Sequence, residues 1–315
     1  MELGLIGLGK MGANMAERLL KGGHKVVGYD RDAQAVRRII EQGNEGANSL
    51  NELVSKLSEG QRLDSSRSFG KSPRIVWLMV PAGKPVDDTI DLLLPLLKSG
   101  DIVVDGGNSH YKDSIRRAKK LAEHSLEMVD AGVSGGIWGL KEGYSIMVGG
   151  DSKTVEYMKP IFETLAPAKD KGWGHVGTNG AGHFVKMVHN GIEYGLMQAY
   201  AEGFDLMKRK TEFKLDLHQV AELWRYGSVV RSWLLDLTAS ALKDDQELKD
   251  IAPFVADSGE GRWTAWEAID LGVSLPVITQ SLYERFASQD NEGYGNRLLA
   301  VMRHEFGGHA MKEDK

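Results

Sequence analysis

One glycine-rich segment, Gly7-Leu8-Gly9-Lys10-Met11-Gly12, constrains the fold more than any other feature of the chain. It follows a short apolar run and opens a stretch with helical periodicity. In a strand–turn–helix unit the first glycine permits the tight turn, the second lets a pyrophosphate approach, and the third lets helix and strand pack closely. The helix N-terminus offers free amides to the phosphates. These six residues therefore predict a dinucleotide site.

The next predicted strand, 25–29, ends beside Asp30 and Arg31. An acidic residue at this spacing accepts hydrogen bonds from the adenosine ribose, and its carboxylate repels the extra phosphate of NADP. Arg31 favours the opposite choice, because a guanidinium pairs with that phosphate. We predict NAD as the preferred cofactor, with NADP as the alternative.

The first half of the chain alternates short apolar runs with amphipathic stretches. Strands are expected at 3–6, 25–29, 75–80, 102–104 and 127–130, with helices such as 12–21 and 33–42 between them. This alternation predicts a parallel sheet with helices on both faces, a doubly wound Rossmann-type α/β fold. Segments 145–148 and 175–176 fit further strands, and the polar stretch 58–72 fits an exposed loop.

Beyond about residue 177 the strand pattern stops and long helical periods take over. A long helix is expected over 180–210, followed by helices at 216–226, 229–243, 265–271, 276–288 and 294–303. We therefore predict a dinucleotide-binding domain over 1–177 and an all-α domain over 178–315.

Composition narrows the class of protein. The net charge of −5 argues against nucleic-acid binding, and the absence of cysteine removes disulfides, thiolate catalysis and cysteine-ligated metal. No signal-peptide pattern and no membrane-spanning apolar run is seen, so a cytoplasmic location is expected. The segment His304-Glu305-Phe306-Gly307-Gly308-His309 lacks the histidine spacing of a zinc-protease helix, so no metal is predicted.

The predicted helix over 180–210 carries an unusual polar face. Helical spacing places five polar side chains on one side, namely Lys186, His189, Asn190, Glu193 and Tyr194. Lysine and glutamate lie two turns apart, roughly 10 Å along the axis. A lysine near a cationic ring and away from water has a lowered pKa, which suits a general base. Glycines around this face would let a ligand lie close, so we favour a catalytic face over a solvated stripe.

Two further segments follow predicted strands, at the ligand-binding end of a parallel sheet. In the segment 130–136, Ser134 and the amides of Gly135 and Gly136 fit a carboxylate or hydroxyls. In the segment 105–109, Asn108 fits a place near the nicotinamide.

These residues together resemble the 6-phosphogluconate dehydrogenases, within the wider β-hydroxyacid dehydrogenase group. The run from His183 to Tyr194 carries the most specific likeness, and the similarity extends from Gly7 to His309. The length, and the segment Ile137-Trp138-Gly139-Leu140, resemble the short form of the family.

The resemblance implies oxidative decarboxylation of 6-phosphogluconate to ribulose 5-phosphate and CO2, with reduction of NAD(P). Lys186 would be general base and then acid, and Glu193 would protonate the enediol at C1. Asn108, Ser134, Gly135, Gly136, His189 and Asn190 would hold the sugar acid, and Met79, Val80, Pro81 and Asn108 would contact the cofactor. A place in the pentose phosphate pathway or in gluconate utilisation is implied.

The substrate phosphate, by the same resemblance, would be held by Tyr194 and Arg285. Arg303 and His309 would reach it from a neighbouring subunit, so the helical domain would also form a homodimer or homotetramer. The segment Gly259-Glu260-Gly261-Arg262-Trp263-Thr264 would form a glycine-rich loop. It departs from the long form, because Ser258 and Glu260 replace a phosphate-binding lysine and threonine. Glu260 is expected to turn away or to interact differently, and Arg262 to compensate.

Two other functions fit parts of this pattern. A relative acting on a non-phosphorylated or non-decarboxylated β-hydroxyacid would need no cationic cluster such as Arg285, Arg303 and His309. A non-enzymatic dinucleotide sensor would be expected to lack the base or the acid, yet Lys186 and Glu193 are both present.

Overall fold

The computed structural model describes residues 1–57 and 72–312. The polar loop predicted over 58–72 lies almost wholly outside the described residues. Two compact units are present, 1–189 and 190–315, and the boundary falls inside one long helix, α8 (Ala181–Arg209). The division into domains 1–177 and 178–315 stays a prediction.

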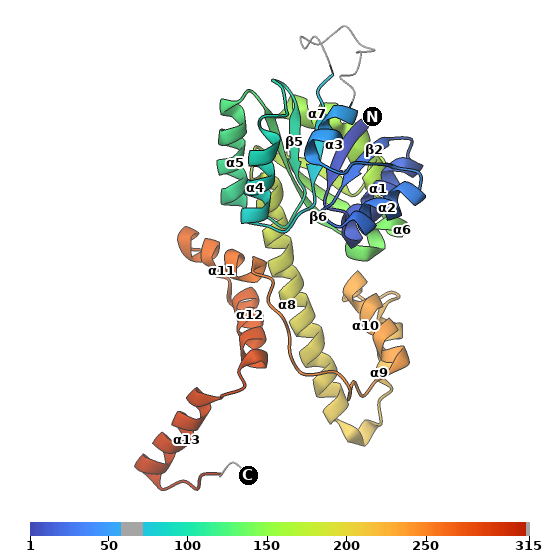
Figure 1. Cartoon of the computed structure of the whole chain (residues 1–315). Coiled ribbons are helices and arrows are strands. Elements are labelled where there is room, and N and C mark those ends of the chain that lie inside the picture. The colour runs from blue at the N-terminus through green and yellow to red at the C-terminus, as the bar shows by residue number, and fades with distance from the viewer. Residues whose placement is uncertain (58–71, 313–315) are drawn as a thin grey trace. The chain divides into compact units, whose positions relative to one another are not determined.

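The first unit is built on one eight-stranded sheet in the order β3-β2-β1-β4-β5-β6-β7-β8 (Figure 1). Its strands are β1 (Glu2–Ile6), β2 (Lys25–Tyr29), β3 (Glu45–Gly46), β4 (Ile75–Leu78), β5 (Ile102–Asp105), β6 (Glu127–Ser134), β7 (Ser145–Gly150) and β8 (Trp173–Gly177). Its connections are α1 (Lys10–Lys21), α2 (Ala33–Glu41), α3 (Leu50–Lys56), α4 (Lys84–Leu93), α5 (Tyr111–Glu123), η1 (Gly136–Trp138), α6 (Gly139–Glu142) and α7 (Ser152–Leu165).

Alternate residues along each strand bury into opposite layers, which explains the continuous apolar runs in the sequence. Leu5 and Trp77 pack with α1, α2 and α7 in one cluster. Ile6 and Leu78 pack with α3, α4 and α5 in the other. The predicted doubly wound α/β fold is therefore confirmed.

The sheet departs from the prediction at β6. This strand pairs in parallel with β5 but antiparallel with β7, so the sheet is mixed. Residues 131–134, expected to lie beyond the strand 127–130, continue β6 because each pairs with a residue of β7, from Ala131 with Val148 to Ser134 with Ser145. Gly135 and Gly136, both with positive φ, follow the strand directly, and Gly136 begins η1. The two-residue strand β3 was not predicted.

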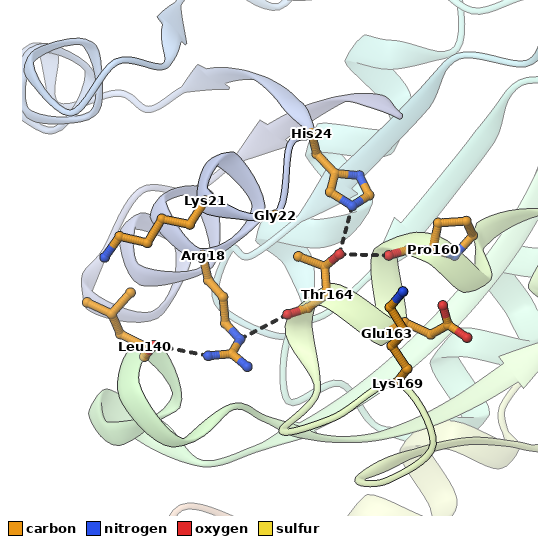
Figure 2. Close-up of a pocket in the computed structure, with 9 residues that line it drawn as sticks. All are labelled: Arg18, Lys21, Gly22, His24, Leu140, Pro160, Glu163, Thr164 and Lys169. Carbon is orange, nitrogen blue, oxygen red and sulfur yellow. Dashed lines mark hydrogen bonds between the residues drawn. The ribbon is translucent and has the colours of Figure 1, made fainter.

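Arg18 on α1 ties that helix to the chain around α7 (Figure 2). Its guanidinium donates to the carbonyls of Thr164, Leu140 and Ala166 at 3.0, 3.1 and 2.6 Å. Five charged or titratable side chains line a cavity of about 510 Å³ here, namely Arg18, Lys21, His24, Glu163 and Lys169. Because Arg18 donates to three carbonyls that belong to separate segments, its role here is structural.

His24 completes this anchor. The Thr164 hydroxyl donates to the Pro160 carbonyl at 2.9 Å, so it accepts from His24 Nε2 at 2.8 Å. That tautomer leaves Nδ1 as a buried acceptor without a partner in the described residues. Burial lowers the pKa of His24 to about 4, so the ring is neutral at pH 7.

The second unit is helical beyond α8. It contains η2 (Thr211–Phe213), α9 (Leu217–Trp224), α10 (Trp233–Asp244), α11 (Glu260–Leu271), α12 (Pro276–Gln289) and α13 (Tyr294–Gly307). One core joins Phe204 of α8 to α9 and α10, and a smaller one joins Tyr194 of α8 to α11 and α12. The predicted all-α C-terminal domain is confirmed.

Helix α11 begins earlier than predicted. Residues 260–264, expected in a glycine-rich loop, form its first turns, and only Gly259 at the N-cap has a left-handed φ of 101°. A Cβ on Gly261 would lie 2.6 Å from Cε2 of Tyr194. Glycine there lets the helix lie directly on the tyrosine ring, so the second glycine serves packing between helices rather than a loop.

Candidate active site

The glycine-rich turn between β1 and α1 is shaped by close backbone contacts. Gly7 has a φ of 95°, and a Cβ on it would lie 2.5 Å from the Met79 carbonyl oxygen. A Cβ on Gly12 would lie 2.0 Å from the Gly7 carbonyl oxygen. Gly9 has no heavy atom within 4 Å of such a position, so the space beside it is open. This arrangement fits a dinucleotide: two glycines close the turn, and the third leaves room for a pyrophosphate.

The amides at the start of α1 are available to a ligand. Gly9 caps the helix with extended backbone and no side-chain hydrogen bond, so Lys10, Met11 and Gly12 begin a helix whose first amides lack a side-chain acceptor. A helix N-terminus of this kind favours phosphate through its amides and its dipole.

Asp30, just after β2, is held by two backbone amides. Its Oδ2 accepts from the Leu8 amide at 2.6 Å, and its Oδ1 accepts from the Asp32 amide at 2.8 Å. Each carboxylate oxygen has a second lone pair, so both can still accept from a ribose hydroxyl. The neighbouring Arg31 is exposed. The turn and the carboxylate are therefore fixed to each other before any cofactor binds.

Lys186 lies buried in the first unit, with 7% of its surface exposed. The strand β6 passes so close that a Cβ on Gly132 would lie 2.4 Å from the Lys186 Cβ. Ser134 at the end of β6 lies 3.4 Å from His189 of α8, measured from Oγ to Nε2. The structure thus brings the predicted Ser134, Lys186 and His189 to one place, where β6 meets the first turns of α8; we name this cluster the lysine half.

Asp130 positions the start of α8, a role that the sequence analysis missed. This residue is fully buried, and its carboxylate accepts from the Gly180 amide at 2.6 Å and from the His183 amide at 3.0 Å. A Cβ on Gly182 would lie 2.5 Å from the Asp130 carbonyl oxygen. Glycines at 180 and 182, flanking a predicted helix start, were the available signal.

Asn108, predicted near the nicotinamide, lies on a turn that Arg117 holds. The Arg117 guanidinium is fully buried and donates to Asp105 at 3.1 Å, to Ser109 at 3.2 Å and to Asp87 at 2.9 Å. Burial alone would raise the pKa of Asp87, but hydrogen bonds from Arg117 and Arg116 lower it to about 2. Asn108 itself is exposed at the tip of this turn.

The second unit carries its own polar cluster around Tyr194. The phenol oxygen lies 2.9 Å from Ser258 Oγ, 3.4 Å from an Asp257 oxygen, and accepts from the Ser258 amide at 3.2 Å. The Arg285 guanidinium lies over the tyrosine ring, 3.4 Å from its centroid. Two residues predicted to hold a phosphate, Tyr194 and Arg285, are thus brought together; with Ser258 and Asp257 they form what we name the phosphate half.

Of the two alternatives expected for Glu260, the structure has the second: the side chain does not turn away but is 4% exposed and accepts a hydrogen bond from the Ser258 hydroxyl. Arg262 pairs with Asp257 and stacks on Phe286, 4.5 Å from its centroid. Burial alone would raise the pKa of Asp257, but hydrogen bonds from Arg262 and the Gly259 amide outweigh it, and that pKa lies below its usual value.

Asn190 and Glu193 belong to the second unit by their place on α8, with Asn190 buried and Glu193 half-buried. Arg303 and His309 lie on α13 and just beyond it, where both are exposed. The His309 carbonyl oxygen lies 2.9 Å from Nδ1 of His304. The predicted roles of these four residues stay predictions.

Two features that are absent from the described residues bear on other classes of protein. Within 1–57 and 72–312, no three His, Asp or Glu side chains come together in a way that could hold a metal ion. Among the helices in those ranges, none has the length and apolar character needed to cross a membrane.

Two family models match the chain almost end to end. The NAD binding domain of 6-phosphogluconate dehydrogenase matches residues 2–177, and the 6-phosphogluconate dehydrogenase C-terminal domain matches residues 182–311. The nicotinamide cofactor predicted from the glycine-rich turn is confirmed at this level.

Several similar proteins are named 6-phosphogluconate dehydrogenase. A Haloferax volcanii NAD(+)-dependent, decarboxylating 6-phosphogluconate dehydrogenase is 44% identical over 317 residues, covering 100% of both chains. A Bacillus subtilis NADP(+)-dependent, decarboxylating enzyme is 38% identical over 92% of this chain but only 62% of its own length. The solved Plasmodium falciparum 6-phosphogluconate dehydrogenase has a TM-score of 0.81 at 31% identity, covering 100% of this chain and 66% of the other. The chain belongs to the decarboxylating 6-phosphogluconate dehydrogenase family, in its short form.

Proposed function

We propose that this protein oxidises and decarboxylates 6-phosphogluconate to ribulose 5-phosphate and CO2 while reducing NAD(P). The buried Lys186, packed against Gly132 of β6 on the same unit as the open glycine turn, is the observation that carries the proposal. The full-length similarity to the Haloferax volcanii enzyme supports it.

The bound nicotinamide would accept the hydride from C3 of the substrate. Lys186 takes the proton of the C3 hydroxyl, so that C3 becomes a carbonyl β to the carboxylate. The C1–C2 bond then breaks, CO2 leaves, and its bonding electrons pass to the carbonyl oxygen, which the protonated Lys186 stabilises. Glu193 donates a proton to the carbon that lost CO2. Ser134, His189 and Asn190 hold the sugar acid during these steps.

Direct assay tests the reaction. The purified protein is given 6-phosphogluconate with NAD or with NADP, and nicotinamide reduction and CO2 release are followed in parallel. Equal amounts of reduced cofactor and CO2 are expected. Reduction without CO2 would contradict decarboxylation, and no reduction with either cofactor would contradict the proposal as a whole.

NAD is the cofactor we propose, because the Asp30 carboxylate is fixed by the Leu8 amide at 2.6 Å. A carboxylate held in this position disfavours the additional phosphate of NADP by charge repulsion. Arg31 is exposed beside it and would lessen the preference.

A non-phosphorylated β-hydroxyacid is the other candidate substrate. Arg285 argues against it: among the described residues this guanidinium contacts the Ala256 carbonyl, a methionine sulfur and the Tyr194 ring, but no carboxylate. A cation left with no counter-charge suits a substrate that brings its own negative group.

A second copy of the chain would complete the site. Every described side chain of α13 is exposed, including Tyr294, Leu298, Leu299, Val301 and Met302. An amphipathic helix with no buried side chain needs a covering surface. We propose a homodimer or homotetramer in which Arg303 and His309 reach the neighbour's phosphate half.

Mixed subunits test this sharing. A Lys186→Met chain is combined with an Arg303→Ala/His309→Ala chain. In a hybrid dimer, one site keeps its lysine and receives an intact tail, so activity should return above that of either variant alone. Activity that remains at the sum of the two separate variants would contradict a shared site.

A further inference from the structure

Each hydrogen bond around Tyr194 has a defined donor and acceptor, and the Glu260 carboxylate determines which group donates. A carboxylate has acceptors only, so the Ser258 hydroxyl donates its single proton to Glu260. Ser258 Oγ must then accept at its other contact, from the Tyr194 hydroxyl at 2.9 Å. The remaining neighbours of the phenol oxygen agree with this direction: the Ser258 amide donates to it, and an Asp257 oxygen is a second acceptor.

The phenol proton of Tyr194 is therefore donated to an acceptor within the protein. Tyr194 offers a ligand only the remaining lone pair of its oxygen, because its proton points to Ser258 or Asp257 and the Ser258 amide donates to the other lone pair. The charged groups around it are the carboxylates of Asp257 and Glu260 and the guanidiniums of Arg262 and Arg285. Arg262 is paired with Asp257, so among the described groups around Tyr194 the buried Glu260 and Arg285 are the two charges without an opposite charge as hydrogen-bond partner.

A phosphate dianion fits such a cluster poorly. It has no proton to donate to the Tyr194 oxygen, and the buried carboxylate of Glu260 repels it. A singly protonated phosphate monoester has one P–OH donor for Tyr194, keeps a charged oxygen for Arg285, and suffers less repulsion. The second pKa of a phosphate monoester is about 6, so both forms are available near neutral pH.

We propose that Glu260 is the specificity-determining residue of this cluster, and that it makes the protein take the substrate phosphate as its monoanion. This inference rests on the proposed function, which assigns the phosphate to Tyr194 and Arg285. Glu260 acts through Ser258 and Tyr194, so it is a positioning residue rather than a catalytic one.

The test is the pH dependence of the KM for 6-phosphogluconate. For the wild-type protein, KM should rise about tenfold per pH unit above the phosphate pKa of about 6, as the monoanion becomes scarce. In Glu260→Gln the repulsion is gone and Ser258 no longer has to donate to residue 260, so the Tyr194 proton can turn to the substrate. KM at pH 8 should fall about tenfold against wild type, while KM at pH 5.5 should change little.

Three companions isolate the cause. Glu202→Gln makes the same chemical change at an exposed site on α8, where the carboxylate accepts from Gln198, and should keep the wild-type KM at each pH. Tyr194→Phe/Glu260→Gln should recover only part of the gain. Ser258→Ala removes the nearer acceptor of the phenol proton without altering residue 260 and leaves the Asp257 oxygen at 3.4 Å, so it should also lower KM at pH 8; it serves if Glu260→Gln fails to fold.

A KM at pH 8 that stays the same or rises in both Glu260→Gln and Ser258→Ala overturns the inference. An equal gain for gluconate, which lacks the phosphate, also overturns it. If wild-type protein does not turn over 6-phosphogluconate, the proposed function fails separately. Calorimetric titration of wild type and Glu260→Gln with inorganic phosphate then decides: tighter binding by the variant at pH 8 but not at pH 5.5 supports the role of Glu260, and equal binding refutes it.

Discussion

The lysine half in the first unit and the phosphate half in the second unit are built in different ways. Around Lys186 the polar groups lie beside the eight-stranded sheet. Close contacts at glycines such as Gly132 hold β6 against the first turns of α8. Around Tyr194 the support is a small core of α8, α11 and α12, and nearby apolar side chains stay exposed, among them Trp266 and Ile269 at 57% and 75%. The first half is complete within one unit of the chain, whereas the second leaves surface that a partner would cover.

The two halves also differ in the partners of their charged side chains. Asp130 in the first unit accepts from two backbone amides at the start of α8, where the helix dipole favours a negative charge, so its carboxylate serves the backbone of that helix. In the second unit, Arg285 and Glu260 have no opposite charge as their hydrogen-bond partner in the described part of the chain. We infer that the polar groups of the lysine half are held in place before a ligand binds, whereas the charges of the phosphate half are compensated by the ligand.

Removing the base should have the largest effect. Lys186→Met takes away the group proposed to move the C3 proton, and general acid–base catalysis contributes roughly 10² to 10⁴ in rate. We expect kcat to fall about 10³-fold while NAD binding, measured by calorimetry, persists. Lys208→Met removes an exposed lysine from the same helix and is the control. If Lys186→Met kept wild-type turnover, the lysine half would lose its assigned role.

Removing the cation of the phosphate half should act on KM. Arg285→Ala deletes a charged hydrogen-bond donor, worth about 1.5–3 kcal/mol. We expect KM for 6-phosphogluconate to rise roughly 10- to 100-fold with a smaller change in kcat. Arg209→Ala, an exposed arginine paired with Asp205, is the matched control. A change confined to kcat would show that the two halves do not divide binding from chemistry.

Acid should weaken the first unit through His24. The folded-state pKa is about 4 and the unfolded value is 6.5, so unfolding takes up a proton between these limits. Stability is therefore full above pH 6.5 and is lost as the pH falls toward 4, by about 2 kcal/mol at pH 5. Denaturant unfolding at pH 7 and pH 5 measures this loss.

The matched variant is His24→Gln, which should unfold with less pH dependence than the wild type over this range. His124→Gln changes an exposed histidine of the same unit and should keep the wild-type dependence. Identical pH profiles for wild type and His24→Gln would show that the buried ring does not control the acid stability of this unit.

The smallest effect is expected at the cofactor. Asp30→Ala removes the carboxylate that accepts from the Leu8 amide and that we propose binds the ribose. We expect the ratio of kcat/KM for NAD over NADP to fall about tenfold, the equivalent of one hydrogen bond to a charged group. An unchanged ratio would assign cofactor selection to Arg31 instead.

The sequence alone predicted the elements whose signals are local. The turn at Gly7–Gly12 sits between an apolar strand and an amphipathic helix, and α8 was predicted within a residue of each end. The family resemblance also lay in local runs, above all His183 to Tyr194. Periodicity over one element is enough for such features, because neighbouring residues create the pattern.

The tertiary structure decided what depends on distant contacts. The continuation of β6 to Ser134 depends on pairing with β7, and the start of α11 at Glu260 depends on Gly261 lying on Tyr194. Asp130 looks like the end of a strand in sequence, yet it caps a helix about 50 residues further along the chain. A glutamate beside a predicted phosphate site is unexpected from the sequence. In the folded chain Glu260 accepts from Ser258, and we infer the direction of the Tyr194 proton from that hydrogen bond. The direction of a hydrogen bond depends on all the groups around it, and only the folded chain brings those groups together.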